Sequence, residues 1–255
     1  MNLKVSIITV TFNSAATLEQ TILSITQQTY TNIEYIIVDG GSTDGTLEII
    51  EKYKNKISKF ISEKDNGLYD ALNKGIDLAT GDVIGILHSD DFYTDNNVVQ
   101  KYVNTFIKNN SEAVYADLFY VDKDNTNKII RKWKSGKHNP NSFLHGWMPP
   151  HPTFFVKREV YQKFGKFNLE FKHSADYELM LRFIHKNKIK INYLHEFTIK
   201  MRVGGQSNFS IQNRIRANTE DREAWKVNDL KPRFYTSYLK PLRKISQFFL
   251  KQKKY

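Results

Sequence analysis

Ile84-Gly-Ile-Leu-His-Ser-Asp-Asp91 is an apolar run that ends in two adjacent aspartates. A short apolar run of this kind predicts a strand buried on both faces, as in parallel sheets. Open α/β sheets bind ligands at the carboxyl ends of such strands. Carboxylate oxygens there can hold a divalent cation, which can in turn bind a diphosphate. This stretch therefore predicts an α/β fold with a ligand site at one edge of the sheet.

Strand and helix patterns alternate through the first hundred residues. Strands are expected at Val5–Phe12, Glu34–Val38, Ile57–Ser62 and Asp82–Leu87, and helices at Ala16–Gln28, Thr46–Tyr53, Leu68–Ala79 and Asn97–Asn109. Such alternation predicts a mostly parallel central sheet flanked by helices on both faces.

The second half of the chain is less regular. Strands are expected at Ala113–Val121, Ile129–Trp133, Thr153–Val156, Ile189–Tyr193 and Phe197–Val203, and helices at Ala175–His185 and Ser210–Val227. We expect one α/β domain over residues 1–205, followed by a C-terminal helical region with a basic tail over residues 206–255.

The basic residues are concentrated at the end of the chain. The net charge is +11, and the stretch from Lys231 to Tyr255 holds eight Lys or Arg residues and no acidic residue. Apolar residues recur there at helical spacing with basic residues on the other faces, and this pattern predicts an amphipathic helix. The apolar face holds Leu239, Leu242, Ile245 and Phe249, and the other faces hold Lys240, Arg243, Lys244 and Lys251. Such a helix suits an anionic membrane surface, with its basic side chains toward the membrane. Alternatively, it docks on its own core and its charged side faces solvent.

Composition limits the setting of the protein. The chain has no cysteine, which excludes disulfides and thiolate metal sites and suits a reducing compartment. No apolar run has the length of a membrane span, no signal peptide pattern is present, and no motif that reads nucleic acid is found. We expect a cytoplasmic protein bound peripherally to the inner face of the plasma membrane, with no nucleic-acid partner.

The segment from Asp39 to Thr46 follows the second strand and contains three glycines. Asp39 lies in line with the strand, so its carboxylate can accept a hydrogen bond from a base or ribose. The alternative is a glycine-rich turn in which Asp44 caps the next helix. Thr11 ends the first strand and joins the nucleotide-binding candidates. Neither a Walker A sequence nor a dinucleotide fingerprint follows that strand, so ATPase and dehydrogenase functions lose their main support.

Asp65-Asn-Gly67 predicts a turn that leaves the N-terminus of the next helix free for phosphate oxygens. Asp65 and Asp70 are therefore further nucleotide-binding candidates. Asp70 and Asn73 are three residues apart and can act together on one helix face. Alternatively, Asp70 complements the helix dipole and Asn73 bonds to a nearby loop.

Asp90 and Asp91 point in opposite directions if the backbone is extended. One carboxylate can then reach a metal ion while the other reaches a ribose hydroxyl. The alternative is that Asp91, Thr94 or Asp95 caps the following helix.

Five motifs together resemble family 2 glycosyltransferases of the GT-A fold. They are Val5 to Asn13, the Asp39-Gly-Gly-Ser-Thr-Asp-Gly run, Asn73-Lys-Gly-Ile76, Ala79-Thr-Gly-Asp82 and Leu87-His-Ser-Asp-Asp91. The resemblance covers roughly residues 4–205. It implies transfer of a sugar from a nucleotide sugar, usually a UDP-sugar, with inversion at the anomeric carbon.

The resemblance also implies roles for individual residues. Asp39 would contact the base, Asp90 the ribose, and Asp91 would hold Mn²⁺ or Mg²⁺. His88 replaces the first acid of the frequent Asp-x-Asp spelling, so metal binding rests mainly on Asp91. Asp176 aligns with the catalytic base, with Ala175 in place of a preceding Glu.

Three further positions have open roles. Glu178 is the second candidate for the base, and Asp176 could instead be an ordinary first-turn carboxylate. His151, held between prolines, is a candidate metal ligand or acceptor contact, although a structural histidine is more common. Arg202 could meet the pyrophosphate, and the loop from Gly204 to Ser207 could close over the donor.

These observations predict an inverting glycosyltransferase that acts on a saccharide acceptor, lipid-linked in cell-surface polysaccharide biosynthesis. The alternative is a catalytically inactive protein of the same fold that serves as an adaptor at the membrane surface.

Overall fold

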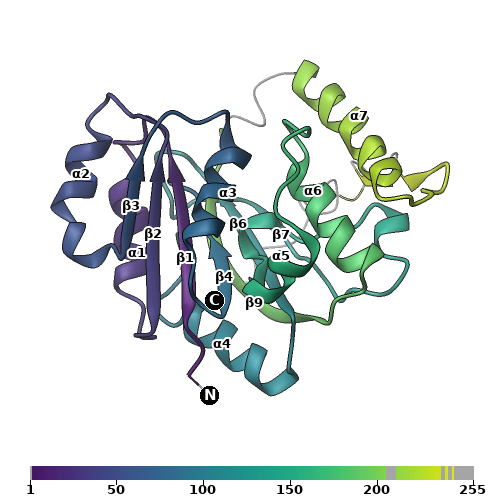
Figure 1. Ribbon diagram of the computed structural model, residues 1–255, viewed down its shortest axis with the longest axis horizontal. Coiled ribbons are helices and arrows are strands. Elements are labelled where there is room, and N and C mark those ends of the chain that lie inside the picture. The colour runs from purple at the N-terminus through teal and green to yellow at the C-terminus, as the bar shows by residue number, and fades with distance from the viewer. Residues whose placement is uncertain (1, 205–210, 237–238, 241–242, 244–255) are drawn as a thin grey trace.

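The computed structural model describes residues 2–204, 211–236, 239–240 and 243 (Figure 1). The first half of the chain forms β1 (Val5–Thr11), α1 (Leu18–Thr26), β2 (Ile33–Asp39), α2 (Thr46–Lys52), β3 (Lys59–Ser62), α3 (Leu68–Leu78), β4 (Val83–Ile86), β5 (Asp91–Tyr93) and α4 (Val98–Asn109). The second half forms β6 (Ala113–Val121), β7 (Ile129–Trp133), β8 (Phe155–Lys157), α5 (Arg158–Phe164), α6 (Ala175–Met180), β9 (Ile191–Arg202) and α7 (Ile211–Val227).

The strands of the described residues form one sheet in the order β3-β2-β1-β4-β8-β6-β9-β5, and β7 also pairs with β6. The first four strands of this order are parallel to one another, as are β6 and β9, whereas β8 runs antiparallel to β4 and β6. The register places Thr11 opposite Asp39, and Asp39 opposite Ser62. The predicted α/β fold is confirmed, and the antiparallel pairs all involve strands from the second half of the chain.

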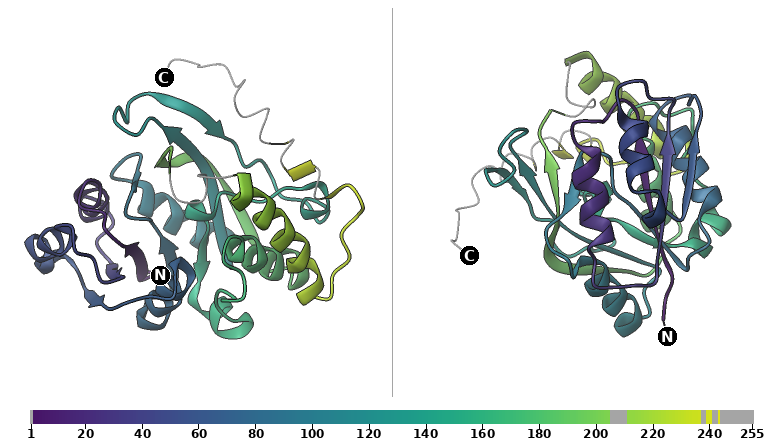
Figure 2. Two further views of the ribbon diagram at one scale, coloured as in Figure 1. Left: turned by 90° about the horizontal axis from the view of Figure 1, so that it is seen from above. Right: turned by 90° about the vertical axis from the view of Figure 1, so that its left-hand side faces the viewer.

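Helices cover both faces of the sheet (Figure 2). One buried cluster joins alternate residues of β1 and β2, such as Ile7 and Ile37, to α1, α2 and α4. The other joins the intervening residues, such as Ile8 and Ile36, to α3, α5, α6 and α7. This arrangement follows from the alternation of side chains along a strand, because both faces of β1 and β2 are apolar.

Four elements differ from the sequence prediction. β5 and α5 were not expected, because three and seven residues are too short to show a clear periodicity. The break expected near residues 194–196 is a register shift in the pairing of one continuous strand, β9, with β6. The second half of the helix expected at Ala175–His185 is π-helical over Leu181–Lys186.

The C-terminal residues pack against the preceding fold. Trp225 of α7 is buried in the cluster that contains α6, and its indole N–H donates to the Tyr177 hydroxyl at 3.0 Å. The division proposed at residue 205 thus separates two parts that share one core, and it stays a prediction.

The described part of the basic tail also contacts the protein. The Nζ of Lys240 lies 2.6 Å from Asp221 of α7 and 3.8 Å from the centre of the Tyr177 ring. The prediction that Lys240 lies on a solvent- or membrane-facing side is wrong, because this buried carboxylate pairs with it. Leu242, Ile245 and Phe249 of the predicted apolar face lie outside the described residues. Where the chain is described, no helix is long and apolar enough to cross a membrane.

Candidate active site

The site begins where β1, β2 and β4 end. Asp39 is fully buried, and its two oxygens accept hydrogen bonds from the Ser42 hydroxyl, the Ser62 hydroxyl and the backbone N–H groups of Gly41 and Ser42. These bonds shape the glycine-containing loop after β2. A contact between Asp39 and a base stays a prediction. Asp44 accepts bonds from the backbone N–H and hydroxyl of Thr46, at the start of α2, which supports the capping alternative for Asp44.

Thr11 lies beside Asp39 in the register and is 5% exposed. Its hydroxyl is buried without a hydrogen-bond partner among the described residues. Buried hydroxyls are usually bonded, so an unsatisfied one at a strand end is consistent with a ligand contact. The nucleotide-binding role of Thr11 stays a prediction.

Asp65 and Asp70 converge on one lysine. The Nζ of Lys74 lies 2.8 Å from Asp65, 2.8 Å from Glu63 and 3.6 Å from Asp70. Asp70 also accepts the backbone N–H of Asn66, just before α3, which suits the alternative that Asp70 complements the helix dipole. Three carboxylates around one cation make the start of α3 a poor place for phosphate oxygens. Asp65 nevertheless lies against Gly40 of the loop after β2, where a ligand contact stays a prediction.

Asn73 fixes the loop that contains Phe167, which is nearby in space. Its side-chain amide donates to the Phe167 carbonyl at 2.9 Å and accepts the Phe167 backbone N–H at 3.0 Å. The alternative of a bond to a nearby loop is therefore observed, and Asn73 does not act together with Asp70.

Asp91 is the most unusual side chain at this edge. It is 1% exposed, and neither of its carboxylate oxygens has a hydrogen-bond partner among the described residues. Burial raises the pKa of Asp91 well above its ordinary value, and the nearby Asp90 carboxylate adds to the increase, whereas Arg202 opposes it. An unpartnered buried carboxylate costs free energy that a bound cation would offset.

The residues present fit a divalent cation at Asp91. No group of three His, Asp or Glu side chains in the described ranges could hold a metal ion by itself. In nucleotide sites, however, Mg²⁺ commonly uses one or two carboxylates and completes its shell with phosphates and water. The helix-capping alternative for Asp91 is wrong. The carboxylate at the start of α4 is that of Asp95, which accepts the backbone N–H of Asn97.

Arg202 holds the turn that carries the two aspartates. It lies at the end of β9 and donates hydrogen bonds to the Asp90 carbonyl and the Gln20 side chain. Its guanidinium also lies 5.0 Å from the Phe92 ring centre. Arg202 therefore fixes the backbone at the start of β5. A contact between Arg202 and pyrophosphate stays a prediction. Gly204 is described, but the rest of the predicted closing loop lies outside the described residues.

His151 lies close to His88, with 6.0 Å between the ring centres. Burial lowers the pKa of His151 to about 3, with a smaller contribution from His88, so the ring is neutral at physiological pH. Its ring also packs edge-on against Phe167 at 5.5 Å. These contacts suit the structural alternative, and metal ligation by His151 stays a prediction.

Asp176 lies in the first turn of α6 and is partly exposed. The Tyr69 hydroxyl of α3 donates to Asp176 Oδ1 at 3.2 Å, and the Tyr69 ring stacks on Phe167 at 5.4 Å. Burial raises the pKa of Tyr69 well above its usual value, and Asp176 adds to this, so the phenol stays protonated. A carboxylate that is open to solvent and oriented by a neutral donor can accept a proton.

Glu178 is excluded as the second candidate for the base. It is 2% exposed, its two oxygens pair with Arg182 at 2.9 Å, and Asn228 of α7 donates to one of them. Both oxygens of Glu178 therefore accept hydrogen bonds from within the protein.

Two side chains lie within electrostatic reach of both Asp176 and the acidic end of β4. Burial raises the pKa of Tyr120 to about 12, Arg131 opposes the rise, and Asp91 and Asp176 both add to it. Burial lowers the pKa of His88, and Asp90 and Asp176 both oppose that change. Tyr69 and Tyr120 were missed from the sequence because each lies in an ordinary apolar pattern.

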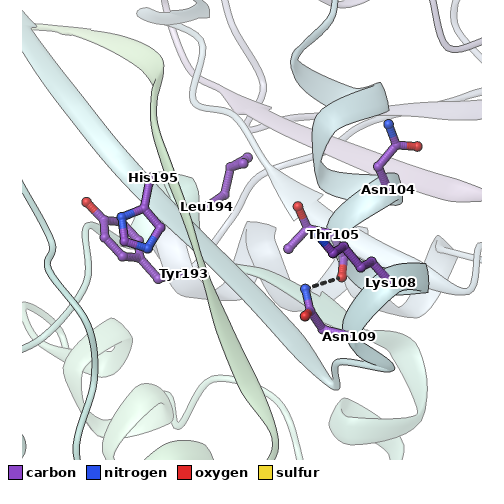
Figure 3. A pocket seen from close by; sticks show the side chains of 7 residues that line it. All are labelled: Asn104, Thr105, Lys108, Asn109, Tyr193, Leu194 and His195. Carbon is purple, nitrogen blue, oxygen red and sulfur yellow. Dashed lines mark hydrogen bonds between the residues drawn. The ribbon is translucent and has the colours of Figure 1, made fainter.

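A surface pocket of about 270 Å³ lies elsewhere, between α4 and the beginning of β9 (Figure 3). His195 and Lys108 are among its lining residues. Arg202 ends the same strand seven residues beyond His195, which is about 20 Å along an extended chain. This pocket is therefore separate from the candidate site.

The family model described as glycosyl transferase family 2 matches residues 6–165. This range contains the strand ends and Asp91 but stops before Asp176. Together with the acidic edge of the sheet, the match defines the class of protein: a glycosyltransferase, an enzyme that transfers sugars. The chain belongs to glycosyltransferase family 2.

Curated relatives agree with this assignment. A PGL/p-HBAD biosynthesis glycosyltransferase of Mycobacterium bovis is 32% identical over 193 residues, which cover 74% of this chain and 73% of that protein. An uncharacterized glycosyltransferase of Haemophilus influenzae is 32% identical over 203 residues, with 78% and 79% covered.

Solved structures show the same fold. S. aureus TarS in complex with UDP-GlcNAc gives a TM-score of 0.68 at 18% identity and covers 89% of this chain, which spans 65% of that structure. The mannosyltransferase PcManGT from Pyrobaculum calidifontis, in complex with GDP-Man and Mn²⁺, gives 0.67 at 18% identity, with 97% and 70% covered. The predicted GT-A fold is confirmed.

Proposed function

We propose that this glycosyltransferase moves a sugar, with inversion, from a UDP-sugar to a hydroxyl group of a saccharide acceptor. One observation carries the proposal: two carboxylates in different surroundings, Asp91 and Asp176, both lie close enough to Tyr120 to raise its pKa. Asp91 is buried and unpartnered, which suits a cation, whereas Asp176 is partly exposed and oriented by Tyr69, which suits a base. A metal-assisted transfer to an alcohol needs these two functions.

The reaction follows from these roles. The acceptor oxygen forms a bond to the anomeric carbon while the bond from that carbon to the diphosphate oxygen breaks. The hydroxyl proton goes to Asp176, and the electron pair of the broken bond leaves with the nucleoside diphosphate. Attack from the side opposite the leaving group inverts the anomeric carbon. A Mn²⁺ or Mg²⁺ ion held by Asp91 would supply positive charge for the departing diphosphate.

The donor is proposed as a nucleotide sugar because the strand ends offer acceptors for a nucleoside. Asp39 and Thr11 lie side by side at the ends of β2 and β1, and Asp90 follows β4. We propose base contact for Asp39 and ribose contact for Asp90. The titles of the two solved structures, with UDP-GlcNAc and GDP-Man, support this donor class.

The test is a transfer and hydrolysis assay with UDP-, GDP- and dTDP-sugars and Mn²⁺, repeated with EDTA. We expect turnover of one donor that EDTA abolishes and that Asp176→Asn lowers about a hundredfold to ten-thousandfold. Asp77→Asn, on the exposed surface of α3, serves as the control and should retain full activity. Wild-type activity in Asp176→Asn would reject the assigned base, and neither binding nor turnover by the wild type would favour the adaptor.

We further propose a lipid-linked acceptor at an anionic membrane surface, on the inner face of the plasma membrane. Support comes from the eight basic residues after position 230 and from Phe234, which is 90% exposed. Aromatic and basic side chains together favour the membrane interface. Because Lys240 is bound to Asp221, deletion of residues 244–255 is the informative truncation. Unchanged binding of this variant to anionic vesicles would reject the proposed role of those residues.

A further inference from the structure

The helix α7 binds the backbone that leads into α6, where Asp176 lies (Figure 1). The carboxylate of Glu220 accepts three backbone hydrogen bonds, from Lys172 at 3.2 Å and from His173 and Ser174 at 2.8 Å each. Three successive amides thus converge on one side chain that is 46 to 48 residues away along the chain.

These contacts hold the backbone immediately before α6. The first N–H groups of a helix and of the segment before it have no intrahelical acceptor. Ser174 stands at the N-cap position of α6, but its side chain makes no capping bond. Its hydroxyl instead donates to the Ala217 carbonyl of α7 at 3.2 Å. The carboxylate of Glu220 supplies the acceptors for the three N–H groups that precede the helix, and a charged acceptor makes stronger bonds than a neutral one.

Further contacts keep α7 in place on α6. Trp225 donates to Tyr177, and Asn228 donates to Glu178 at 2.9 Å. Since Tyr177 and Glu178 follow Asp176 directly, α7 contacts residues on both sides of it. A shift of the backbone at residues 172–174 would therefore turn the Asp176 side chain relative to Tyr69.

We infer that Glu220 is a positioning residue: it fixes the backbone of residues 172–174 so that Asp176 faces the acceptor hydroxyl. This inference rests on the proposed role of Asp176 as the base. It assigns to the C-terminal region a part in the reaction, although that region lies beyond the residues that the family model matches. The residue before Asp176 is Ala175, and the carboxylate that bonds to this backbone segment comes from another helix, as Glu220.

Glu220→Gln tests the inference with little change in size. The amide of glutamine keeps one acceptor oxygen but turns an N–H donor toward at least one backbone N–H, so at least one of the three bonds is lost. Glu223→Gln is the matched control, because Glu223 lies on the same helix and pairs only with the exposed Lys226 in the described residues.

Two measurements on the full-length protein separate the contact from its effect on the reaction. Hydrogen exchange of the Lys172–Ser174 amides reports the contact and needs no substrate. We expect faster exchange there in Glu220→Gln and unchanged exchange in Glu223→Gln. In the transfer assay we expect kcat to fall about tenfold to a hundredfold, with the donor KM within about twofold of wild type, since misplacement of a catalytic group acts on the chemical step.

Each other outcome rejects the inference. Unchanged exchange in Glu220→Gln would show that the three bonds do not hold this segment. Faster exchange with unchanged kcat would show that the segment does not position the base. A higher donor KM together with a lower thermal stability would indicate a merely structural role. A wild type that transfers no sugar would reject the proposed function itself, while the exchange data would still report on the contact.

Discussion

The Asp91 side chain combines burial with a lack of partners, and this combination predicts a conflict between stability and activity. Asp91→Asn removes a charge that is costly to bury and that repels Asp90. We expect the free energy of unfolding to stay constant or rise by about 1 kcal/mol, as is common when a functional site is neutralised. We expect transfer to fall about a hundredfold or more, because the cation loses its carboxylate.

Urea denaturation and the transfer assay measure both effects of Asp91→Asn. Asp124→Asn, in the exposed turn between β6 and β7, is the control and should change neither quantity. A less stable but fully active Asp91→Asn variant would show that Asp91 is an ordinary structural carboxylate.

At single residues, the sequence located the acidic strand ends but could not tell which carboxylates are free. The Asp91 carboxylate has no hydrogen-bond partner among the described residues, and Asp176 is partly exposed, so each could take part in the reaction. Glu178 and Asp70, by contrast, accept hydrogen bonds within the protein. The partner of Glu178 on α7, Asn228, is 50 residues away, so no local pattern reveals that bond. Residue type and spacing therefore identify the candidate carboxylates, and tertiary contacts decide which of them are available for the reaction.

Glu34 joins three elements at the end of the sheet opposite the site. It lies in β2 and accepts bonds from the Ser6 hydroxyl of β1 at 2.6 Å and from the Thr80 backbone and hydroxyl after α3, each at 2.7 Å. Burial alone would raise the pKa of Glu34, but these hydrogen bonds and Lys4 outweigh burial and hold the pKa far below its usual value.

The lowered pKa of Glu34 sets the sign of a pH effect. The folded state binds the proton less tightly than the unfolded state, so the stabilisation is complete above the ordinary pKa of about 4.3 and is lost as the pH falls toward the folded-state pKa. We expect Glu34→Gln to lower the free energy of unfolding by about 2 kcal/mol at pH 7. The difference from wild type should shrink by about 1.4 kcal/mol per pH unit below about 4.3.

Denaturation curves of wild type and Glu34→Gln at pH 7, 4 and 3 check this prediction. Glu159→Gln, an exposed glutamate of α5, should follow the wild type at each pH. A difference that stays constant from pH 7 to pH 3 would mean that Glu34 does not titrate as its contacts require.

For whole elements, the long periodic strands and helices were predicted well and the short ones were not. β1, β2 and α3 follow from apolar patterns of seven or more residues, whereas β5 exists only because it pairs with β9, more than a hundred residues later. The π-helical turn after α6 was also missed, because periodicity does not separate it from an α-helix. Elements that depend on distant pairing give no signal within a short window of sequence.

In the whole molecule, the C-terminal residues are tied to the fold more closely than their composition suggested. A charged, low-hydrophobicity segment predicts a solvated or membrane-bound tail. The buried Asp221 and Trp225 change this, since they give Lys240 and α6 specific partners. Single buried residues in a polar helix decide such packing, and a pattern averaged over the helix hides them.

Gly146 marks the place where the start of the tail lies against the core. A Cβ atom there would come within 2.5 Å of the Lys240 backbone nitrogen, and the backbone has a φ of +72°. Gly146→Ala should therefore displace residues 239–240 and separate Lys240 from the buried Asp221. We expect a loss of about 1–3 kcal/mol in the free energy of unfolding from the steric contact, beyond the backbone strain.

Gly136→Ala isolates that strain, because Gly136 has a φ of +71° and no atom within 4 Å of its Cβ position. Denaturation of both variants gives the difference due to the tail contact, and proteolysis near Lys240 reports whether the segment has been released. We expect Gly146→Ala to be the less stable variant and to be cut faster by trypsin after Arg243, since the bond after Lys240 precedes Pro241 and resists trypsin. Equal stability and equal cleavage in the two variants would contradict the prediction and would mean that the contact at Gly146 contributes nothing to holding the tail on the fold.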